Sequence, residues 1–461
     1  MEKYKKLAWE RENKEYSFSI NEKKKGALLL KKAENVYIKN GKLRTGIGLK
    51  NVLDSQKETI MMPNSLPTMD SIFYVWSKTL GATGKKTLAY LSADGAFYLY
   101  DDDIGAFALQ HKFSGKMKAI SVIKKANVNE YYTVFVGKNG VFTYSLDTGL
   151  EQITGIEALP VGCFCGGRTF YARHGHNVVY SELYLPWTFT DSIEGAGMLS
   201  LPSIYGTMVG METLRDKVFL FYERGIQILT VSGNARDFSV QSLAYSGGKI
   251  FADTIATFGI GGEKAVFLAE DGVYAVNENR VWRLATNIQI APARGSQACH
   301  CAAFDGTYVA AYLDTDGEER RVAVDVQTES GYEIFNCKGV VSYGGEGFCV
   351  VNNLLQSFCT YGNLYRGNYF LAETESTNFG KRGKKTIEEI RYYGTGDCTV
   401  TVTADGKTSG QIIFMRDGYV TVKRKLRGEN FSFKIQLEQK STMEKISVTF
   451  QRLKGGEQDG N

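Results

Sequence analysis

Short apolar runs interrupted by glycine-containing turns repeat along most of the chain. The cleanest copies read LAYLSADGAFYLY, YTVFVGKNGVFTYSL, VFLFYERGIQIL and AVFLAEDGVYAV. Tight hairpin turns need positive φ, which glycine adopts without strain, so each copy indicates two paired strands. The turn glycines are 35 to 50 residues apart and are Gly95, Gly140, Gly175, Gly225, Gly272, Gly317 and Gly362. A period of about 40 to 50 residues is typical of a β-propeller blade, and we expect six or seven blades.

The segments around these repeats indicate how the first part of the chain is organised. Residues 1–25 are polar and rich in lysine, which predicts an N-terminal arm. We expect the propeller to occupy residues 26–375, with the early segment 26–53 supplying the strand that closes the ring. Residues 181–203 lack alternation and contain two of the six prolines, so they are interpreted as an inter-blade loop.

The pattern changes after residue 375. Residues 376–386 are polar, basic and interrupted by glycine, which predicts a linker. Six short alternating runs follow in residues 387–454, with turns predicted at Asp405-Gly406 and Asp417-Gly418, and residues 455–461 form an expected flexible tail. The predicted fold class is therefore all-β: a six- or seven-bladed β-propeller followed by a small C-terminal antiparallel β-sandwich.

Composition supports this interpretation and adds little about partners. Among 461 residues, 27 Tyr, 26 Phe and 50 Gly stand against only 6 Pro, which favours strands and tight turns. The formal charge of +5 is weak evidence for any partner. The chain begins without the apolar stretch of a secretory signal, shows no span of 18 apolar residues, and has too few cysteines for a disulfide scaffold. We therefore expect synthesis in a reducing cytoplasm.

Basic residues in the predicted linker and in the middle of the predicted sandwich are candidate contacts with a DNA lumen or a neighbouring subunit. Clustered cations attract phosphates through a field that is independent of base sequence. The competing interpretation is a solvated surface with charged strand edges. The candidates are Lys381, Arg382, Lys384, Lys385, Lys423, Arg424 and Lys425.

Two groups of residues resemble metal ligand sets without matching their usual spacing. The first combines Cys163 and Cys165 with His174 and His176, and the second is the run 299–301, Cys-His-Cys. Zinc ligand pairs are usually separated by two to four residues, and cysteine is often buried for packing alone. The loops GATGKKT and DTDGEE also lack the complete phosphate-binding and calcium-binding patterns. We expect no metal and no cofactor.

Known catalytic motifs are missing from the sequence, including the Gly-x-Ser-x-Gly elbow and the His-Glu-x-x-His helix. The expectation is that the chain is not an enzyme. The enzyme alternative makes a specific prediction, which is a group of carboxylates with perturbed pKa values that converge at the propeller axis.

Several stretches, in order, resemble the β-propeller tail hub or nozzle family of short-tailed bacteriophages, also called packaged-DNA stabilisation proteins. They are AENVYIKNGKLRTGIGL, GRTFYARHGHNVVYSELYLPWTFTD, the run from METLRDKVFLFYERGIQILTVSG to AVFLAEDGVYAV, and NFGKRGKKTIEEIRYYGTGDCTVTVTADG. The resemblance touches about 350 residues as pattern and order, and it departs most between residues 340 and 375.

This resemblance implies a virion protein that assembles in the host cytoplasm. It implies a homo-oligomeric ring, hexameric in that family, that continues the portal channel, retains packaged double-stranded DNA and joins further tail proteins. Portal or adaptor proteins would be its neighbours, and it would have no membrane span. The alternative function is a cytoplasmic β-propeller scaffold that binds a protein or peptide partner.

Overall fold

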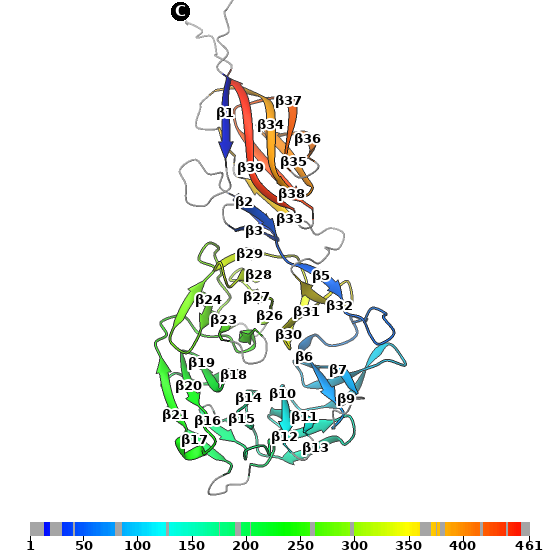
Figure 1. The fold of residues 1–461 in the computed structure, drawn as a ribbon, viewed down its shortest axis with the longest axis vertical. Helices are drawn as coiled ribbons and strands as arrows, with labels where there is room; N and C mark the ends of the chain where they lie inside the picture. Colours follow the sequence, from blue (N-terminus) through cyan, green and yellow to red (C-terminus); the bar gives the residue numbers. More distant parts are fainter. Residues whose placement is uncertain are drawn as a thin grey trace, which may run out of the picture. The chain divides into compact units, whose positions relative to one another are not determined.

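The computed structural model describes most of the chain as strands and turns (Figure 1). Its contacts divide the chain into two compact units, which are described separately below. One consists of residues 49–331 and 336–359, and the other of residues 1–48, 332–335 and 360–461. The described residues are 13–18, 30–39, 42–78, 85–125, 129–174, 176–189, 195–202, 204–258, 263–295, 299–359, 370–374, 376–378, 383–414, 418–438 and 441–452.

The first unit is a propeller with seven blades among the described residues, and six of these blades are separate four-stranded antiparallel sheets. Blades 1 and 2 consist of β6 (Met69–Trp76), β7 (Lys86–Ser92), β8 (Ala96–Asp101), β9 (Ala106–Lys112), then β10 (Met117–Lys124), β11 (Glu130–Gly137), β12 (Gly140–Ser145) and β13 (Gly149–Thr154). Blades 3 and 4 consist of β14 (Gly162–Cys165), β15 (Arg168–Arg173), β16 (Asn177–Tyr180), β17 (Gly197–Ser200), then β18 (Met208–Leu214), β19 (Lys217–Tyr222), β20 (Gly225–Thr230) and β21 (Ser239–Leu243).

Blades 5 to 7 complete the ring. Blades 5 and 6 consist of β22 (Ala256–Thr257), β23 (Ala265–Ala269), β24 (Gly272–Val276), β25 (Val281–Leu284), then β26 (His300–Phe304), β27 (Thr307–Leu313), β28 (Glu319–Asp325) and β29 (Ser330–Glu333). Blade 7 consists of β30 (Lys338–Tyr343), β31 (Glu346–Val351), β32 (Leu354–Cys359) and β5 (Gly48–Asn51). Two short 3₁₀ turns, η1 (Ala235–Asp237) and η2 (Ala252–Thr254), lie between strands of this unit.

The predicted glycine turns join the second and third strands of successive blades. Gly140, at the β11–β12 turn, has φ of 107°, and a side chain there would collide with the carbonyl of Thr154. Gly225, at the β19–β20 turn, is required for a different reason, because a Cβ would overlap the ring of Tyr205. The repeat in the sequence is therefore the central hairpin of each blade.

The seventh turn differs from the prediction. Gly362 lies outside the described residues, and β31 and β32 are joined by Asn352 and Asn353, whose φ values are 52° and 63°. Asparagine tolerates this left-handed conformation better than most residues, so a hairpin forms here without glycine. The structure thus resolves the predicted count of six or seven blades as seven.

Blade 7 is closed by a strand from the early part of the chain, which confirms the prediction that residues 26–53 supply the closing strand. β5 pairs with β32, so the last blade combines residues that are about 300 positions apart. The Gln356 amide donates to the side-chain oxygen of Asn51 over 2.8 Å, and the Val52 N–H donates to the Leu355 carbonyl over 3.2 Å. This pairing removes a free edge at the point where the ring would otherwise open.

The hydrophobic core of the propeller lies between consecutive blades. Blades 1 and 2 share one apolar cluster, in which the rings of Phe97 and Phe135 are 5.0 Å apart. Blades 4 and 5 share another, where Phe221 and Phe267 are 5.6 Å apart. Central strands are therefore covered on both faces, which explains why they are continuous apolar runs instead of alternating ones.

The predicted inter-blade loop at 181–203 contains a strand. Residues 197–200 form β17, the outermost strand of blade 3, which pairs with β16 from Tyr180↔Gly197 to Asn177↔Ser200. The strand has only four residues and none of them is buried, so its sequence carries almost no periodic signal.

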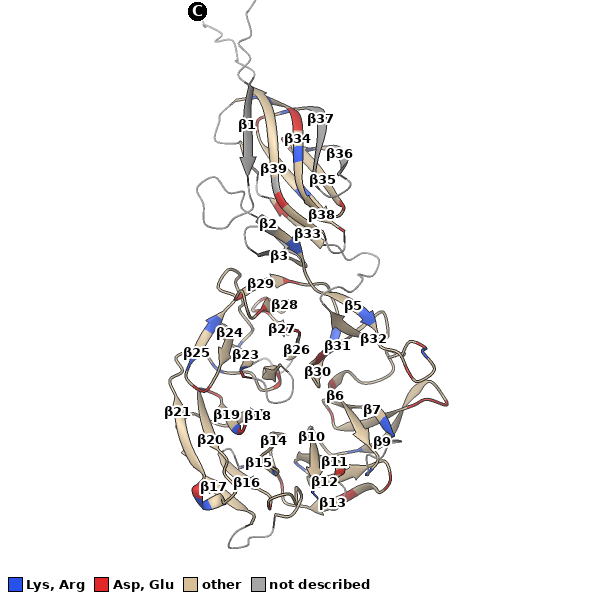
Figure 2. Ribbon diagram, viewed as in Figure 1, with Lys and Arg blue, Asp and Glu red and all other residues tan. Residues whose placement is uncertain are grey.

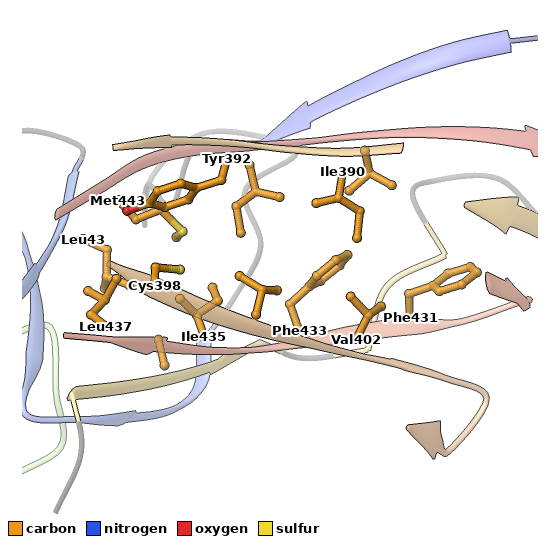
Figure 3. Close-up of a cluster of buried hydrophobic side chains, with 14 of the residues drawn as sticks. Leu43, Ile390, Tyr392, Cys398, Val402, Phe431, Phe433, Ile435, Leu437 and Met443 are labelled. Carbon is orange, nitrogen blue, oxygen red and sulfur yellow. The ribbon is translucent and has the colours of Figure 1, made fainter. Parts of the chain in front are cut away.

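The second unit is a β-sandwich with two facing layers (Figure 3). Ile390 of one layer points toward Phe433 of the other. The first layer contains β3 (Val36–Lys39), β4 (Lys42–Thr45), β39 (Thr442–Arg452), β34 (Lys385–Thr395) and β37 (Gly418–Gly428), with β1 (Asn13–Phe18) paired to β39. The second contains β2 (Leu30–Glu34), β33 (Phe370–Thr374), β38 (Phe431–Leu437), β35 (Cys398–Ala404) and β36 (Lys407–Phe414).

The sandwich is larger than predicted because both ends of the chain contribute strands. The six predicted runs are β34–β39, and the Asp405-Gly406 turn joins β35 to β36 as expected. β1 falls in the predicted arm, whereas β2–β4 and β33 fall in the predicted propeller range 26–375. The predicted linker 376–386 also includes Thr377, which bridges Phe431. Residues 1–12, 19–25, 417 and 455–461 lie outside the described residues.

Candidate functional site at the propeller axis

Charged residues from four blades meet at the axis of the propeller. We call this set the axial charge cluster, and all its members line a cavity of about 120 Å³ that residues of all seven blades surround. They come from β6, from β10 and the residue before it, from β18 and from η2, and they are Asp70, Lys116, Lys118, Glu212 and Asp253.

Lys116 holds two carboxylates from distant blades. Its Nζ lies 2.8 Å from Oδ1 of Asp70 and 2.6 Å from Oδ2 of Asp253. His300 adds a sixth-blade side chain, with Nδ1 4.0 Å from the same Asp70 oxygen. Burial alone would lower the pKa of Lys116, but Asp253 and Asp70 outweigh it and raise the pKa above its ordinary value. Lys116 is therefore a charged link between blades 1, 2 and 5.

The second pair links blades 2 and 4. Lys118 Nζ lies 3.5 Å from Oε1 of Glu212. Glu212 raises the pKa of Lys118, an effect that burial opposes. Burial raises the pKa of Glu212, which Lys118 in turn opposes. Each charge in this low-dielectric site thus has an opposite partner, which is what keeps a buried ion tolerable.

These contacts bear on the enzyme alternative. Three carboxylates do converge at the axis, and one of them has a raised pKa, as that alternative predicts. Each of the three is paired with a lysine ammonium. Such pairing sets two ammonium groups against three carboxylates and ties blades together, so the axial charge cluster links strands from different blades.

The axis opens into a wider mouth with a volume of about 1030 Å³. The size suits a small ligand or a peptide segment. The inner cavity of about 120 Å³ has room for only a few water molecules, so it does not admit a DNA duplex. Polar residues of both signs line the mouth and include Lys116, Glu223, Lys249, His300, Arg320 and Arg321.

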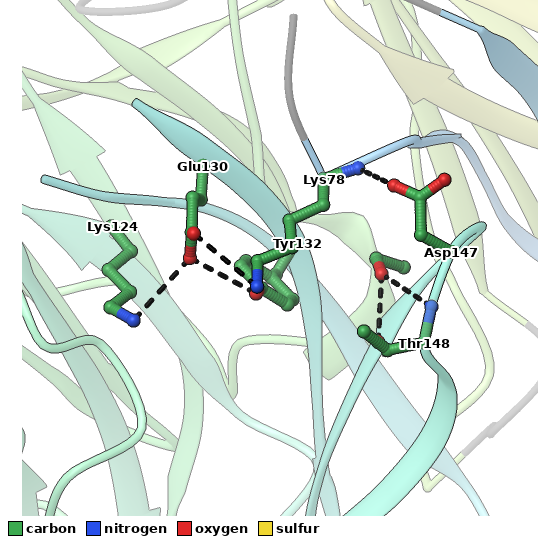
Figure 4. Close-up of polar contacts among 7 residues, drawn as sticks. Lys78, Lys124, Glu130, Tyr132, Asp147 and Thr148 are labelled. Atoms are coloured by element: carbon green, nitrogen blue, oxygen red, sulfur yellow. Dashed lines mark hydrogen bonds and ion pairs between the residues drawn. The ribbon is translucent and has the colours of Figure 1, made fainter. Parts of the chain in front are cut away.

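A separate polar network joins blades 1 and 2 (Figure 4). Glu130 lies 3.4 Å from the ammonium of both Lys78 and Lys124, and the Tyr132 hydroxyl donates to it over 3.2 Å. Burial would raise the pKa of Glu130, but Lys124 and Tyr132 help to hold it below its usual value. Trp187 of blade 3 packs against Tyr132 with ring centroids 4.5 Å apart. The network joins neighbouring blades through contacts of one carboxylate with two ammonium groups and a hydroxyl.

The predicted basic contacts are only partly described. Lys381 and Arg382 lie outside the described residues, and Lys423, Arg424 and Lys425 lie in β37, where the structure describes no side chains. Lys385 is fully buried, and its ammonium donates to the carbonyls of Gly383 and Glu429 over 2.8 and 3.1 Å.

Lys385 is therefore a structural residue in this chain and not a surface contact, which corrects that part of the prediction. Lys384 is exposed and remains a candidate. The pKa of Asp405 is lowered first by the backbone N–H groups of Asn430 and Glu429, with further contributions from Lys384 and Lys385.

The two suspected metal sites do not assemble. In the part of the chain that the structure describes, no group of three or more histidine, cysteine, aspartate or glutamate side chains is placed to hold a metal ion. Burial raises the pKa of Cys163 well above its usual value and that of Cys165 to about 11, so both thiols stay protonated at neutral pH. Their burial reflects packing in the core that blades 3 and 4 share.

Sequence reasoning did not identify the axial charge cluster. Its members are distributed over about 180 residues, and no local spacing joins Asp70 to Asp253. One signal was present in the sequence. Asp70 and Lys118 each directly follow the methionine that begins the first strand of a blade, in MDSIFYVW and MKAISVIK. A charge in such an apolar strand indicates a position near the axis once the blade register is known.

Comparisons with known proteins identify no family and no function. No protein-family model matches the chain, and no curated protein matches it. Among solved structures, U3-55K has a TM-score of 0.42 at 10% identity and covers 65% of this chain and 97% of its own. The β-propeller domain of Cps50 (Swd1) from Myceliophteria thermophila has a TM-score of 0.41 at 10% identity, with 65% and 98% coverage.

A third similar structure is BamB from Moraxella catarrhalis, with a TM-score of 0.38 at 12% identity, covering 82% of this chain and 97% of its own. At these values the similarities carry no argument about what this chain binds. None of the helices in the described ranges has the length and apolar character needed to cross a membrane.

Proposed function

We propose that this chain is a structural protein of a bacteriophage tail, in which copies form a ring that continues the portal channel. In this role it retains packaged DNA and connects tail components. The sequence resemblance supports the proposal, because its motifs fall on consecutive blades. The Leu-Pro-Trp segment follows β16 in blade 3, Arg224-Gly225 turns the central hairpin of blade 4, and Asp271-Gly272 turns that of blade 5.

The observation that carries the proposal is that segments far apart in the sequence pair with each other in both units. β5 closes the propeller against β32, and strands from both ends of the chain, β1 and β39, pair in the sandwich. Neither unit therefore presents an unpaired terminal strand at these positions from which a sheet could be peeled. A wall that surrounds pressurised DNA benefits from this arrangement, since local opening starts at free edges and chain ends.

The narrow axis of the propeller limits the path that DNA could take. Because the inner cavity is too small for a duplex, DNA in a ring of these chains would pass between copies and not through a propeller. The exposed Lys384 and the basic β37 are then the candidate lumen or inter-subunit contacts, acting through a field that does not depend on base sequence.

The direct test combines the full chain with the portal protein of the same phage genome and examines the mixture by electron microscopy. We expect symmetric density added to the portal ring, and class averages that show one propeller for each added copy. A portal of an unrelated phage is the matched control and should remain bare. A chain that stays monomeric with its own portal, while it captures a peptide at the propeller mouth, would contradict the proposal and support the scaffold alternative.

A further inference from the structure

Partly exposed aromatic side chains form a continuous row across blades 7, 1 and 2. The ring centroid of Tyr74 lies 6.0 Å from that of Tyr343 and 6.4 Å from that of Trp76. The centroids of Trp76 and Tyr131 are 6.2 Å apart. All four side chains are partly open to solvent. Ring contacts therefore run without a gap from β30 through β6 to β11, which are neighbouring strands (Figure 1).

The row continues toward blade 3 through a bridge of charged side chains. The Tyr131 N–H donates to the Lys78 carbonyl over 3.0 Å, and Glu130 joins the ammonium groups of Lys78 and Lys124 (Figure 4). Lys124 in turn places its Nζ 5.5 Å from the centre of the Trp187 ring. We call the resulting set of rings the aromatic band, and its members are Tyr343, Tyr74, Trp76, Tyr131, Trp187 and Tyr184.

The aromatic band lies at the end of the propeller axis opposite to the mouth. β6 and β30 both begin in the lining of the mouth, to which they contribute Asp70 and Lys338. The same two strands end in the band, at Trp76 and Tyr343. Trp76 follows Asp70 by six residues, which at about 3.3 Å per residue of strand is about 20 Å. The band is therefore separate from the mouth.

Lysine ammonium groups lie over ring faces in both parts of the band. Lys86 Nζ lies 4.5 Å from the centre of the Tyr74 ring and 5.5 Å from that of Trp76. Lys125 Nζ lies 3.7 Å from the centre of the Tyr184 ring. Both lysines are exposed, so their ammonium groups are also open to an anion from solvent. The band thus offers flat ring faces and positive charge at the same places.

Lysines outnumber carboxylates among the described residues beside the band, although blades 1 and 2 contain both (Figure 2). Glu346 adds to the effect of burial in raising the pKa of Tyr74, so this ring is neutral at physiological pH. The acidic run 101–103 lies two strands outward from β6, at about 10 Å for a strand spacing of about 4.8 Å. The lysines are Lys78, Lys85, Lys86, Lys124 and Lys125, and the carboxylates are Glu130, Asp147 and Glu346.

The combination of rings and ammonium groups matches the repeating unit of a single-stranded nucleic acid. Each nucleotide has a base that can stack on an aromatic side chain and a phosphate that attracts a lysine. The bases of a duplex are paired and stacked on one another, so they are closed to such rings. An acidic polysaccharide has no π face, and its hydroxyl groups need acceptors, whereas an ammonium group only donates.

We propose that the aromatic band binds single-stranded nucleic acid, with bases stacked on its rings and phosphates held by its lysines. The inference goes beyond the proposed function, which concerns packaged duplex DNA. It does not rest on that function, because one chain carries the whole band and can be tested alone.

The direct test titrates the full chain into a fluorescent oligothymidylate of about 15 nucleotides and follows anisotropy. We expect saturable binding that weakens with salt, and binding of a blunt duplex of the same length that is weaker by about tenfold or more. An oligouridylate distinguishes RNA from DNA as the source of the strand, and binding of either supports the inference. Equal affinity for the duplex, or displacement of the strand by hyaluronate at equal charge, would overturn it.

Replacing Trp76 tests the stacking. Trp76→Ala should weaken binding of the strand by about tenfold or more, because one base loses its ring. Trp76→Phe keeps a ring at this position and should retain most of the affinity. Circular dichroism verifies that both variants are folded.

Replacing Lys86 tests the phosphate contact with a side chain whose exposure makes folding insensitive to it. Lys86→Gln should lower the affinity and reduce the slope of log affinity against log salt concentration by about 0.7, the value for one phosphate of a single strand. Lys338→Gln, at an exposed lysine of the mouth, is the matched control and should bind like the unaltered chain. An equal effect of Lys338→Gln, or unchanged binding by Lys86→Gln, would overturn the inference.

Discussion

Arg168 shows how one residue can hold a large segment of loop structure. Its guanidinium is buried, and this burial lowers its pKa. It donates hydrogen bonds to three backbone carbonyls in the segments around β17 and β21. A lysine cannot reproduce these contacts, because a point charge on a flexible stem does not span three acceptors as a planar fork does. The sequence context GGRTFYAR gave no indication that this arginine is buried, since arginine is usually exposed.

Arg168→Ala should lower the free energy of unfolding by about 3 kcal/mol or more, because it leaves buried acceptors unpaired and a cavity behind. Thermal unfolding followed by circular dichroism measures the loss. Arg224→Ala, at the exposed central turn of blade 4, is the control and should change stability by less than about 0.5 kcal/mol. Equal stability of the two variants would show that the three contacts contribute nothing.

At the scale of elements, turns and edge strands are where sequence and structure diverge. The glycine pattern correctly predicted a hairpin between the second and third strands of six blades, although Gly175 itself lies outside the described residues. The Asn352-Asn353 turn was missed because two asparagines carry a weaker turn signal than an Asp-Gly pair. Short outer strands such as β17 were not predicted from the sequence. They are strands because they pair with the neighbouring strand, here β16, and their own residues give little indication of it.

The Asn352-Asn353 turn leads to a sharp prediction. Asn353→Val should destabilise the chain by about 1 to 2 kcal/mol, because a β-branched residue is strained at φ of 63°. Asn353→Gly accepts this conformation and should remain within about 1 kcal/mol of the unaltered chain. Denaturant midpoints at constant m-value measure both variants. A valine variant as stable as the glycine variant would contradict the assigned turn.

Closure of blade 7 by β5 is testable at the element scale too. Val52→Pro removes the N–H that donates to the Leu355 carbonyl, and it should lower the protection of β30–β32 from hydrogen exchange before any other blade is affected. Val52→Ala keeps the N–H and is the control. Uniform loss of protection around the ring would mean that β5 does not act as a local closure.

At the scale of the whole molecule, the axial charge cluster links blades that are far apart in sequence. Lys116 alone joins β6 of blade 1 to η2 at the start of blade 5. Such links add to the apolar cores between neighbouring blades, which connect only consecutive repeats. The ring therefore has contacts across its axis as well as around its rim.

Lys116→Met should cost about 2 to 3 kcal/mol at neutral pH, somewhat below the loss for a fully buried pair because solvent reaches the axis. The pKa of Lys116 is raised on folding, so its stabilisation is complete below the ordinary lysine pKa of about 10.4 and is lost as pH rises through the higher folded value.

The difference in unfolding free energy between the unaltered chain and Lys116→Met should therefore be constant from neutral pH upward and shrink only in strongly alkaline solution. Chemical denaturation across this range measures it. The variant that also carries Asp70→Asn and Asp253→Asn is the control and should recover part of the loss. A difference that shrinks already near pH 7 would contradict a raised pKa.

Local residue patterns were enough to predict the all-β class, the repeated central hairpins, the closing segment before blade 1 and the six alternating runs of the sandwich. These features depend on residues close together in the chain, where strand periodicity and turn chemistry are local properties. Four features became visible only in the folded chain: the count of seven blades, the use of both chain ends in the sandwich, the burial of Lys385 and the axial charge cluster. Each of these depends on which distant segments meet, and a buried lysine or a paired aspartate carries the same letters as an exposed one.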